Sequence, residues 1–167
     1  MNADQTEELE RVHRQAVADG MVKVGLPMTD RDGCVEWCFA HRLSPTLARI
    51  DNVPVFCDEV HFGDVVEYRE QDPPHPLFKD FVRGRTQGST TYVFPVFDDE
   101  EAMPAEDELR AVMGRVRASL LSMPEGDRPL AVEGVMAGWL ASAWPLSVTQ
   151  EFRAKAIAWA VVWQGED

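Results

Sequence analysis

The feature that most limits the fold of this chain is a series of short extended segments, each bounded by turn-forming residues. Apolar and polar residues alternate in "MVKVGLPM" (21–28) and again in "CVEWCFAHRL" (34–43), and the turn sequence "TDRDG" separates them. Alternation with a period of two is typical of β-strands that bury one face. The pattern predicts a β-hairpin. The residues expected on one face of its second strand are Val35, Trp37 and Phe39.

Further extended segments follow. They are "LARIDNVPVFC" (47–57), "HFGDVVEY" (61–68), "FVRGRT" (81–86) and "STTYVFPVF" (89–97). Pro54 favours an edge position or a bulge, because proline donates no backbone hydrogen bond. The turn signals between them are Gly63-Asp64, a proline-rich loop near residues 72–76 and Gln87-Gly88. The strands on either side of the proline-rich loop are expected to share a sheet. Five or six short strands predict a small, strongly bent antiparallel sheet or barrel.

Three segments have helical periodicity. The first covers residues 4–19, where Asp4 with Glu7 or Thr6 with Glu10 could form the N-terminal cap. The second covers residues 104–123 and carries acidic residues in its first turn, where the helix dipole favours them. The third runs from a capping box of Ser147 and Gln150 to Trp163. Its expected buried face is Phe152, Ala156, Trp159 and Val162 or Trp163.

The segment between the last two helices is ambiguous. Residues 128–146 form an apolar run interrupted by glycines, and periodicity alone does not distinguish a buried strand from a buried helix there. Gly134 and Gly138 cost a helix more than a sheet, which favours a strand, although the choice for residues 130–145 stays open. The chain is thus expected to be an α+β protein: a helix over 1–20, then a single α+β domain over 21–167. In that domain a small bent antiparallel sheet or barrel is followed by a strand-helix-strand-helix segment.

Charge and termini narrow the function. The 29 acidic and 16 basic residues give a net charge of -13, which opposes binding to nucleic acid or to anionic membranes. The charged N-terminus resembles no secretory signal, and no segment is apolar over the length of a membrane span, so a cytoplasmic location is expected. An odd count of three cysteines favours reduced thiols.

A resemblance covers residues 21–146. The pattern E-x-x-x-A at Glu36 to Ala40 is followed by "IDNVPVF", "FGDVVEY" and "GSTTYVFPVF". In this order the motifs resemble the bacterial domain-of-unknown-function family 4265, in which N-(I/V)-P-(F/V) precedes G-D-(V/I)-V. The resemblance implies an α+β fold in bacteria, and it implies no catalytic residues. Backbone roles in turns are expected for Asn52, Pro54 and Asp64.

Several residues invite a catalytic or metal-binding interpretation. The possible ligands are Cys34, Cys38, His41, Cys57 and His61. Residues four apart on a strand lie about 13 Å from each other, too far to share one ion, so no metal site is expected. His61 with Asp64 or Glu59 could act as a general base with an orienting carboxylate. The chain carries no nucleophile elbow, phosphate-binding loop or His-Glu-x-x-His motif, so neither a catalytic site nor a cofactor is predicted.

The acidic run "DDEEAMPAEDE" (98–108) suits either a solvated loop or a face for a basic partner. The predicted partner-binding residues are Asp98, Asp99, Glu100, Glu101, Glu106, Asp107 and Glu108. Four tryptophans, Trp139, Trp144, Trp159 and Trp163, are expected to pack in the core. These observations favour a non-enzymatic binding protein that neutralises a basic protein, of the immunity-protein or inhibitor type. The alternative is a small enzyme or ligand-binding domain that uses a pocket at the barrel mouth.

Overall fold

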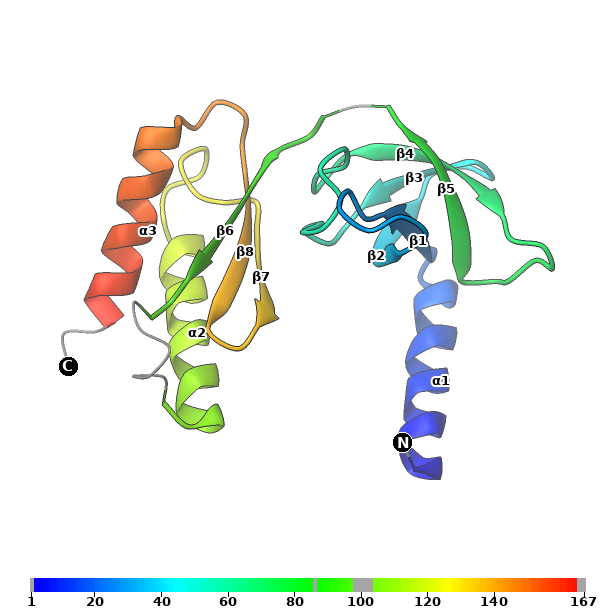
Figure 1. Cartoon of the computed structure of the whole chain (residues 1–167), viewed down its shortest axis with the longest axis horizontal. Coiled ribbons are helices and arrows are strands. Elements are labelled where there is room, and N and C mark those ends of the chain that lie inside the picture. The colour runs from blue at the N-terminus through cyan, green and yellow to red at the C-terminus, as the bar shows by residue number, and fades with distance from the viewer. Residues whose placement is uncertain (1, 86, 98–103, 165–167) are drawn as a thin grey trace. The chain divides into compact units, whose positions relative to one another are not determined.

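The computed structural model describes residues 2–85, 87–97 and 104–164, with the side chains of 162–164 left out. The chain forms two compact units, Met1–Gln87 and Gly88–Asp167 (Figure 1). The expected division was different, with a helix to residue 20 and one domain over 21–167. The predicted fold class is confirmed: in the described ranges, three helices and eight strands form an α+β protein with a closed barrel.

The first unit is a helix followed by a five-stranded barrel (Figure 1). Its elements are α1 (Ala3–Ala18), β1 (Met21–Pro27), β2 (Val35–Arg42), β3 (Leu47–Ile50), β4 (Val65–Glu70) and β5 (Phe78–Gly84). Consecutive strands pair antiparallel, and β1 closes the barrel by pairing parallel with β5. The parallel closure follows from the odd number of strands, because the first and fifth strands of an up-and-down series run in the same direction. The predicted hairpin and the pairing across the proline-rich loop are therefore confirmed.

Small and β-branched side chains fill the barrel. The buried cluster consists of Val22, Val24, Leu26, Cys38, Ala40, Ala48, Ile50, Cys57, Val60, Val66 and Tyr68. On β2 the inward residues are Cys38 and Ala40, whereas Trp37 lies outside with 40% of its surface exposed. The ring of Trp37 rests on Gly25, where an added Cβ would come within 3.1 Å of it. The interior of a five-stranded barrel is narrow, and on β2 the face with the smaller residues turns inward.

Two side chains fasten the loop between β3 and β4 to the barrel. The Glu36 carboxylate accepts from the backbone N–H of Val55 at 3.1 and 3.0 Å and from that of Phe56 at 3.0 Å. Asn52 Oδ1 accepts from the N–H of Phe39 at 2.6 Å. The extended segment predicted over 47–57 is thus a strand only to Ile50, because side-chain hydrogen bonds replace strand pairing in the rest.

The N-terminal helix begins at Ala3, one residue before the predicted start, and its N-cap is Asn2. Asn2 Oδ1 accepts from the Gln5 N–H at 2.9 Å, and Gln5 Oε1 accepts from the Asn2 N–H at 3.0 Å. This capping box takes the place of the predicted Asp4 or Thr6 caps. Every side chain of α1 stays at least partly exposed.

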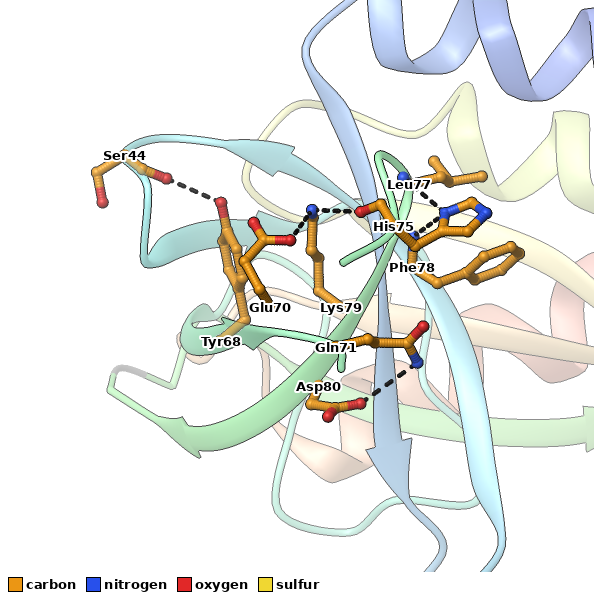
Figure 2. A network of polar contacts seen from close by, with 9 residues as sticks. All are labelled: Ser44, Tyr68, Glu70, Gln71, His75, Leu77, Phe78, Lys79 and Asp80. Atoms are coloured by element: carbon orange, nitrogen blue, oxygen red, sulfur yellow. Dashed lines mark hydrogen bonds and ion pairs between the residues drawn. The ribbon is translucent and has the colours of Figure 1, made fainter. Parts of the chain in front are cut away.

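A polar network lies at one end of the barrel (Figure 2). Lys79 Nζ, with its side chain 4% exposed, donates to Glu70 Oε2 and to the His75 carbonyl oxygen, both at 2.7 Å. The Tyr68 hydroxyl donates to the Ser44 carbonyl oxygen at 3.0 Å. His75 Nδ1 accepts from the N–H groups of the two residues that precede Lys79. These bonds satisfy the buried polar groups that the strand ends bring together.

The second unit is a three-stranded sheet with two helices packed on one face (Figure 1). Its elements are β6 (Thr90–Pro95), α2 (Glu106–Leu121), β7 (Ala131–Met136), β8 (Trp139–Trp144) and α3 (Gln150–Gln164). The strand order is β6-β8-β7, and both pairings are antiparallel. The open choice over 130–145 resolves as two strands, joined through Gly138 at φ +81°. The expected hairpin at Gln87-Gly88 was wrong, because that dipeptide is the boundary between the units and β6 pairs with β8.

The core of the second unit lies between the sheet and the helices. It contains Phe94, Val96, Leu109, Val116, Leu120, Val132, Leu140, Trp144, Ala156, Ile157 and Ala160. In α3 the buried face is Ala156, Ile157 and Ala160, so the expected face was wrong for Phe152 and Trp159, which are exposed. Small residues let the helix approach its neighbours closely, and the bulky rings turn outward. The side chain of Trp163 lies outside the described residues. At the start of α3, Thr149 Oγ1 accepts from the Phe152 N–H, so Thr149 takes the capping role expected for Ser147.

Within the described residues, no helix is both long enough and apolar enough to cross a bilayer.

Candidate functional site

The predicted acidic site is described in part. Asp98, Asp99, Glu100 and Glu101 lie outside the described residues. Glu106, Asp107 and Glu108 form the first turn of α2, and all three side chains are exposed. Three carboxylates there stabilise the helix through its dipole, and the N-cap Ala105 makes no side-chain cap bond.

An apolar groove begins at this acidic turn. It has a volume of about 520 Å³ and lies between α2 and the β7–β8 hairpin. Its lining residues are Glu106, Leu109, Arg110, Met113, Gly114, Arg117, Gly134, Val135, Met136, Ala137 and Leu140. The groove therefore combines a mainly apolar surface with charged side chains contributed by one helix.

Two glycines line the groove on opposite walls. An added Cβ at Gly114 would meet nothing within 4 Å, so this position on α2 borders open space. Across the groove, a Cβ at Gly134 would lie 3.8 Å from Met113 Cε, which is ordinary contact. The strand pairing shifts register between Gly134 and Met136, and Met136 is 56% exposed. Exposed methionines beside glycines form a surface that can adapt to different side chains.

The charged groups of the groove are held by bonds within the unit. Arg110 Nη2 donates to Glu106 Oε1 at 3.0 Å, one turn apart on the helix surface. Arg117 Nε donates to the Val132 carbonyl oxygen at 2.8 Å. Negative charge is thus concentrated at the start of α2, and a guanidinium stands near the start of β7.

Sequence reasoning missed most of this groove. Met113 lies within the segment 104–123 that was predicted as the second helix, and Gly134 was noted only as a residue unfavourable to helix. A glycine at position 114, inside a strongly periodic helix, was the available signal, because such a glycine destabilises a helix unless a close approach or an opening requires it.

The alternative catalytic residues form a turn. Asp64 is buried, and its Oδ2 accepts from the His61 backbone N–H at 2.9 Å. The distance from Asp64 Oδ2 to His61 Nδ1 is 3.8 Å, which is too long for a hydrogen bond between carboxylate and ring. Gly63 stands between them at φ +84°, and Glu59 is exposed. This arrangement matches the expected structural role of Asp64 in the turn.

The possible metal ligands are dispersed. Cys38 and Cys57 are buried in the barrel core, and Cys34 is exposed. Burial raises the pKa of the Cys57 thiol. In the described ranges, no three His, Cys, Asp or Glu side chains come together in a way that could hold a metal ion.

The comparisons with known proteins give the fold alone. No family model matches the chain, and no curated protein matches it. The chain is similar to the crystal structure of a hypothetical protein from Neisseria gonorrhoeae, with 13% sequence identity and a TM-score of 0.50. The similarity covers 82% of this chain and 83% of that one. It therefore extends over both compact units.

Proposed function

We propose that this chain is a non-enzymatic binding protein that masks a basic protein partner, in the manner of an immunity protein or inhibitor. The observation that carries the proposal is the position of Glu106. Its side chain belongs to the exposed acidic turn of α2 and also lines the apolar groove. A basic surface with a projecting apolar side chain would meet both features at once.

The two features have different physical roles. Exposed carboxylates attract a basic partner over distance and raise the association rate, an effect that salt screens. An apolar side chain that enters the groove beside Met113 and Met136 loses contact with water, which slows dissociation. The net charge of -13 favours a basic protein over nucleic acid as the partner. We also place the protein in the cytoplasm, in keeping with its odd count of three cysteines.

The test starts with capture of a partner. The tagged full chain is incubated with lysate of its own organism at low salt, bound proteins are eluted with high salt, and a basic protein is identified and purified. Its association rate with the wild-type chain should fall steeply as ionic strength rises. A salt-independent rate would contradict the electrostatic part of the proposal.

Variants then locate the contact. The triple change Glu106→Gln, Asp107→Asn and Glu108→Gln should lower the association rate about tenfold at low salt, within the range of steering effects. Its matched control neutralises three exposed acids of the first unit, Asp30→Asn, Asp32→Asn and Asp58→Asn. Gly114→Leu should fill the groove and increase the dissociation rate, whereas Gly114→Ala should not. Equal effects of the two triple variants, or an unchanged affinity of Gly114→Leu, would overturn the proposed site.

A further inference from the structure

β7 is an edge strand beside the groove. Among the described residues it pairs with β8 only, in the order β6-β8-β7. An edge strand presents backbone N–H and C=O groups that can pair with another extended chain. The groove residues Gly134, Val135 and Met136 belong to this strand or its bulge.

The direction of the backbone groups follows from one hydrogen bond. The Val132 carbonyl oxygen accepts from Arg117 of α2, so it points away from β8 and toward the outer edge. Backbone groups alternate along a strand, and the N–H and C=O of Gly134 therefore point to the same edge. That edge and the inner side of α2 are the two walls of the groove.

The length of the groove suits an extended peptide. Glu106 and Arg117 line it and are eleven residues apart on α2, which corresponds to about 16 Å along the helix axis. About five residues of an extended strand cover that distance. The Arg117 end lies beside Val132 at the start of β7, so α2 and β7 run in opposite directions along the groove.

We infer that an extended segment of the partner adds to the outer edge of β7 as a fourth strand and places alternate apolar side chains in the groove. This inference rests on the proposed function and specifies how the same groove is used. The occupant has a basic residue near Glu106 and an acidic residue near Arg117. Main-chain hydrogen bonds to β7 supply affinity, and the apolar side chains supply selectivity.

The charges at the two ends link the direction of the added strand to the order of the charged residues in it. An antiparallel strand has its N-terminus at the Glu106 end, so it requires a basic N-terminal and an acidic C-terminal residue. Two acetylated and amidated fluorescent peptides of equal composition serve as probes: Lys-Lys-Thr-Val-Thr-Leu-Thr-Glu and its reversed sequence. Fluorescence anisotropy with the full chain should show that one of the two peptides binds at least about tenfold more tightly than the other. A tenfold difference in affinity is what matching the charges at one end of the groove should contribute.

N-methylation of the peptide tests the backbone pairing directly. Two further versions of the tighter peptide carry N-methyl groups on alternate residues, in the two possible phases. In strand addition only one phase turns its N–H groups toward β7, so one version should lose about tenfold in affinity and the other should bind nearly as well as the parent. Equal losses in both versions, or no binding of either parent peptide up to about 1 mM, would overturn strand addition.

The protein offers a matched pair on its own side. Gly134→Pro removes an outward N–H that β8 does not use, and edge strands tolerate proline at such positions. Gly134→Ala keeps that N–H, and its Cβ makes an ordinary contact with Met113. Strand addition predicts weaker peptide and partner binding for Gly134→Pro than for Gly134→Ala, with both folded by circular dichroism. If Gly114→Leu abolishes partner binding while Gly134→Pro preserves it, strand addition fails and the proposed function stands. If neither variant affects binding of the partner, the groove is not the contact surface and the site proposed above fails as well.

Discussion

Arg117 of α2 donates its Nε–H to the carbonyl oxygen of Val132 in β7 at 2.8 Å. A helix side chain thereby occupies one acceptor on the outer edge of the sheet and fixes the distance between the two walls of the groove. The contact is local to the second unit and links its stability to its proposed binding site.

Replacing Arg117 with methionine should therefore destabilise the second unit. The variant keeps much of the apolar stem but loses a charged hydrogen bond, which should lower the free energy of unfolding by about 1 kcal/mol. Arg110→Met is the control, because its exposed pair with Glu106 contributes only about 0.3 kcal/mol. Urea unfolding followed by circular dichroism measures both. Equal effects would show that the bond to Val132 contributes no more than an exposed pair.

Glu36 should be important for stability even though it resembles an ordinary surface acid. Its carboxylate accepts three hydrogen bonds from the N–H groups of Val55 and Phe56. Glu36→Gln replaces one acceptor oxygen by a donor and should cost about 1–3 kcal/mol of unfolding free energy. Glu59→Gln, at an exposed position of the same loop, should change stability by less than about 0.5 kcal/mol. A result within that limit for Glu36→Gln would refute the proposed anchoring of the loop.

The barrel should lose stability at alkaline pH through Tyr68. Burial raises the pKa of this phenol, Arg42 opposes the shift, and Glu70 adds to it. The pKa of Tyr68 is therefore higher in the folded state than in the unfolded state. The stabilisation that the protonated phenol gives the fold is complete below the unfolded pKa of about 10, and it is lost as the pH rises from there through the folded pKa.

Tyr68→Phe removes that titration together with the hydrogen bond to Ser44. At neutral pH the variant should be less stable by about 1 kcal/mol, and above about pH 10 the difference from wild type should shrink. Unfolding free energies measured between neutral and alkaline pH check both parts. A difference that stays constant with pH would contradict ionisation of Tyr68 as a cause.

The Lys79–Glu70 pair should respond unequally to removal of its two members. Glu70→Ala leaves a buried ammonium without its carboxylate and should cost about 2–3 kcal/mol. Lys79→Met leaves the half-exposed Glu70 carboxylate, which water can solvate, and also removes the donor to the His75 carbonyl oxygen. This change should lower the free energy of unfolding by about 1 kcal/mol. Thermal or urea unfolding gives the order, and a reversed order would disprove this account of the pair.

Thiol accessibility offers a direct check of the barrel core. Cys34 is exposed, whereas Cys38 and Cys57 are buried, and burial raises the pKa of the Cys57 thiol. At pH 8 the native chain should react quickly with one equivalent of a thiol reagent and slowly with two more, while the chain in denaturant should react with three at similar rates. Mass spectrometry of labelled peptides should assign the fast site to Cys34. Fast labelling of Cys57 in the native chain would place it outside the core.

Much of the candidate groove was beyond sequence reasoning. The acidic turn at Glu106 was visible as a charge cluster, but nothing in the sequence shows that β7 lies along α2 with Gly134 opposite Met113. Those residues are more than twenty positions apart, and their contact depends on how the helix packs across the sheet. Asp64 was assigned correctly to a backbone role in its turn, because short polar side chains beside turns usually bond to nearby main chain. Asn52 also bonds to main chain, but its partner is Phe39 of β2 and not its own turn.

The sequence by itself determined where strands and helices form and what charge they carry. Alternation, helical periodicity and turn residues are local signals, and they located the β1–β2 hairpin, α2 and the final helix within a few residues. Only the tertiary structure decided that β6 pairs with β8, and that Trp37 and Trp159 face outward. Strand partners and the buried face depend on how much volume a closed barrel or a packed helix can enclose, which is a property of the whole unit and not of any short segment.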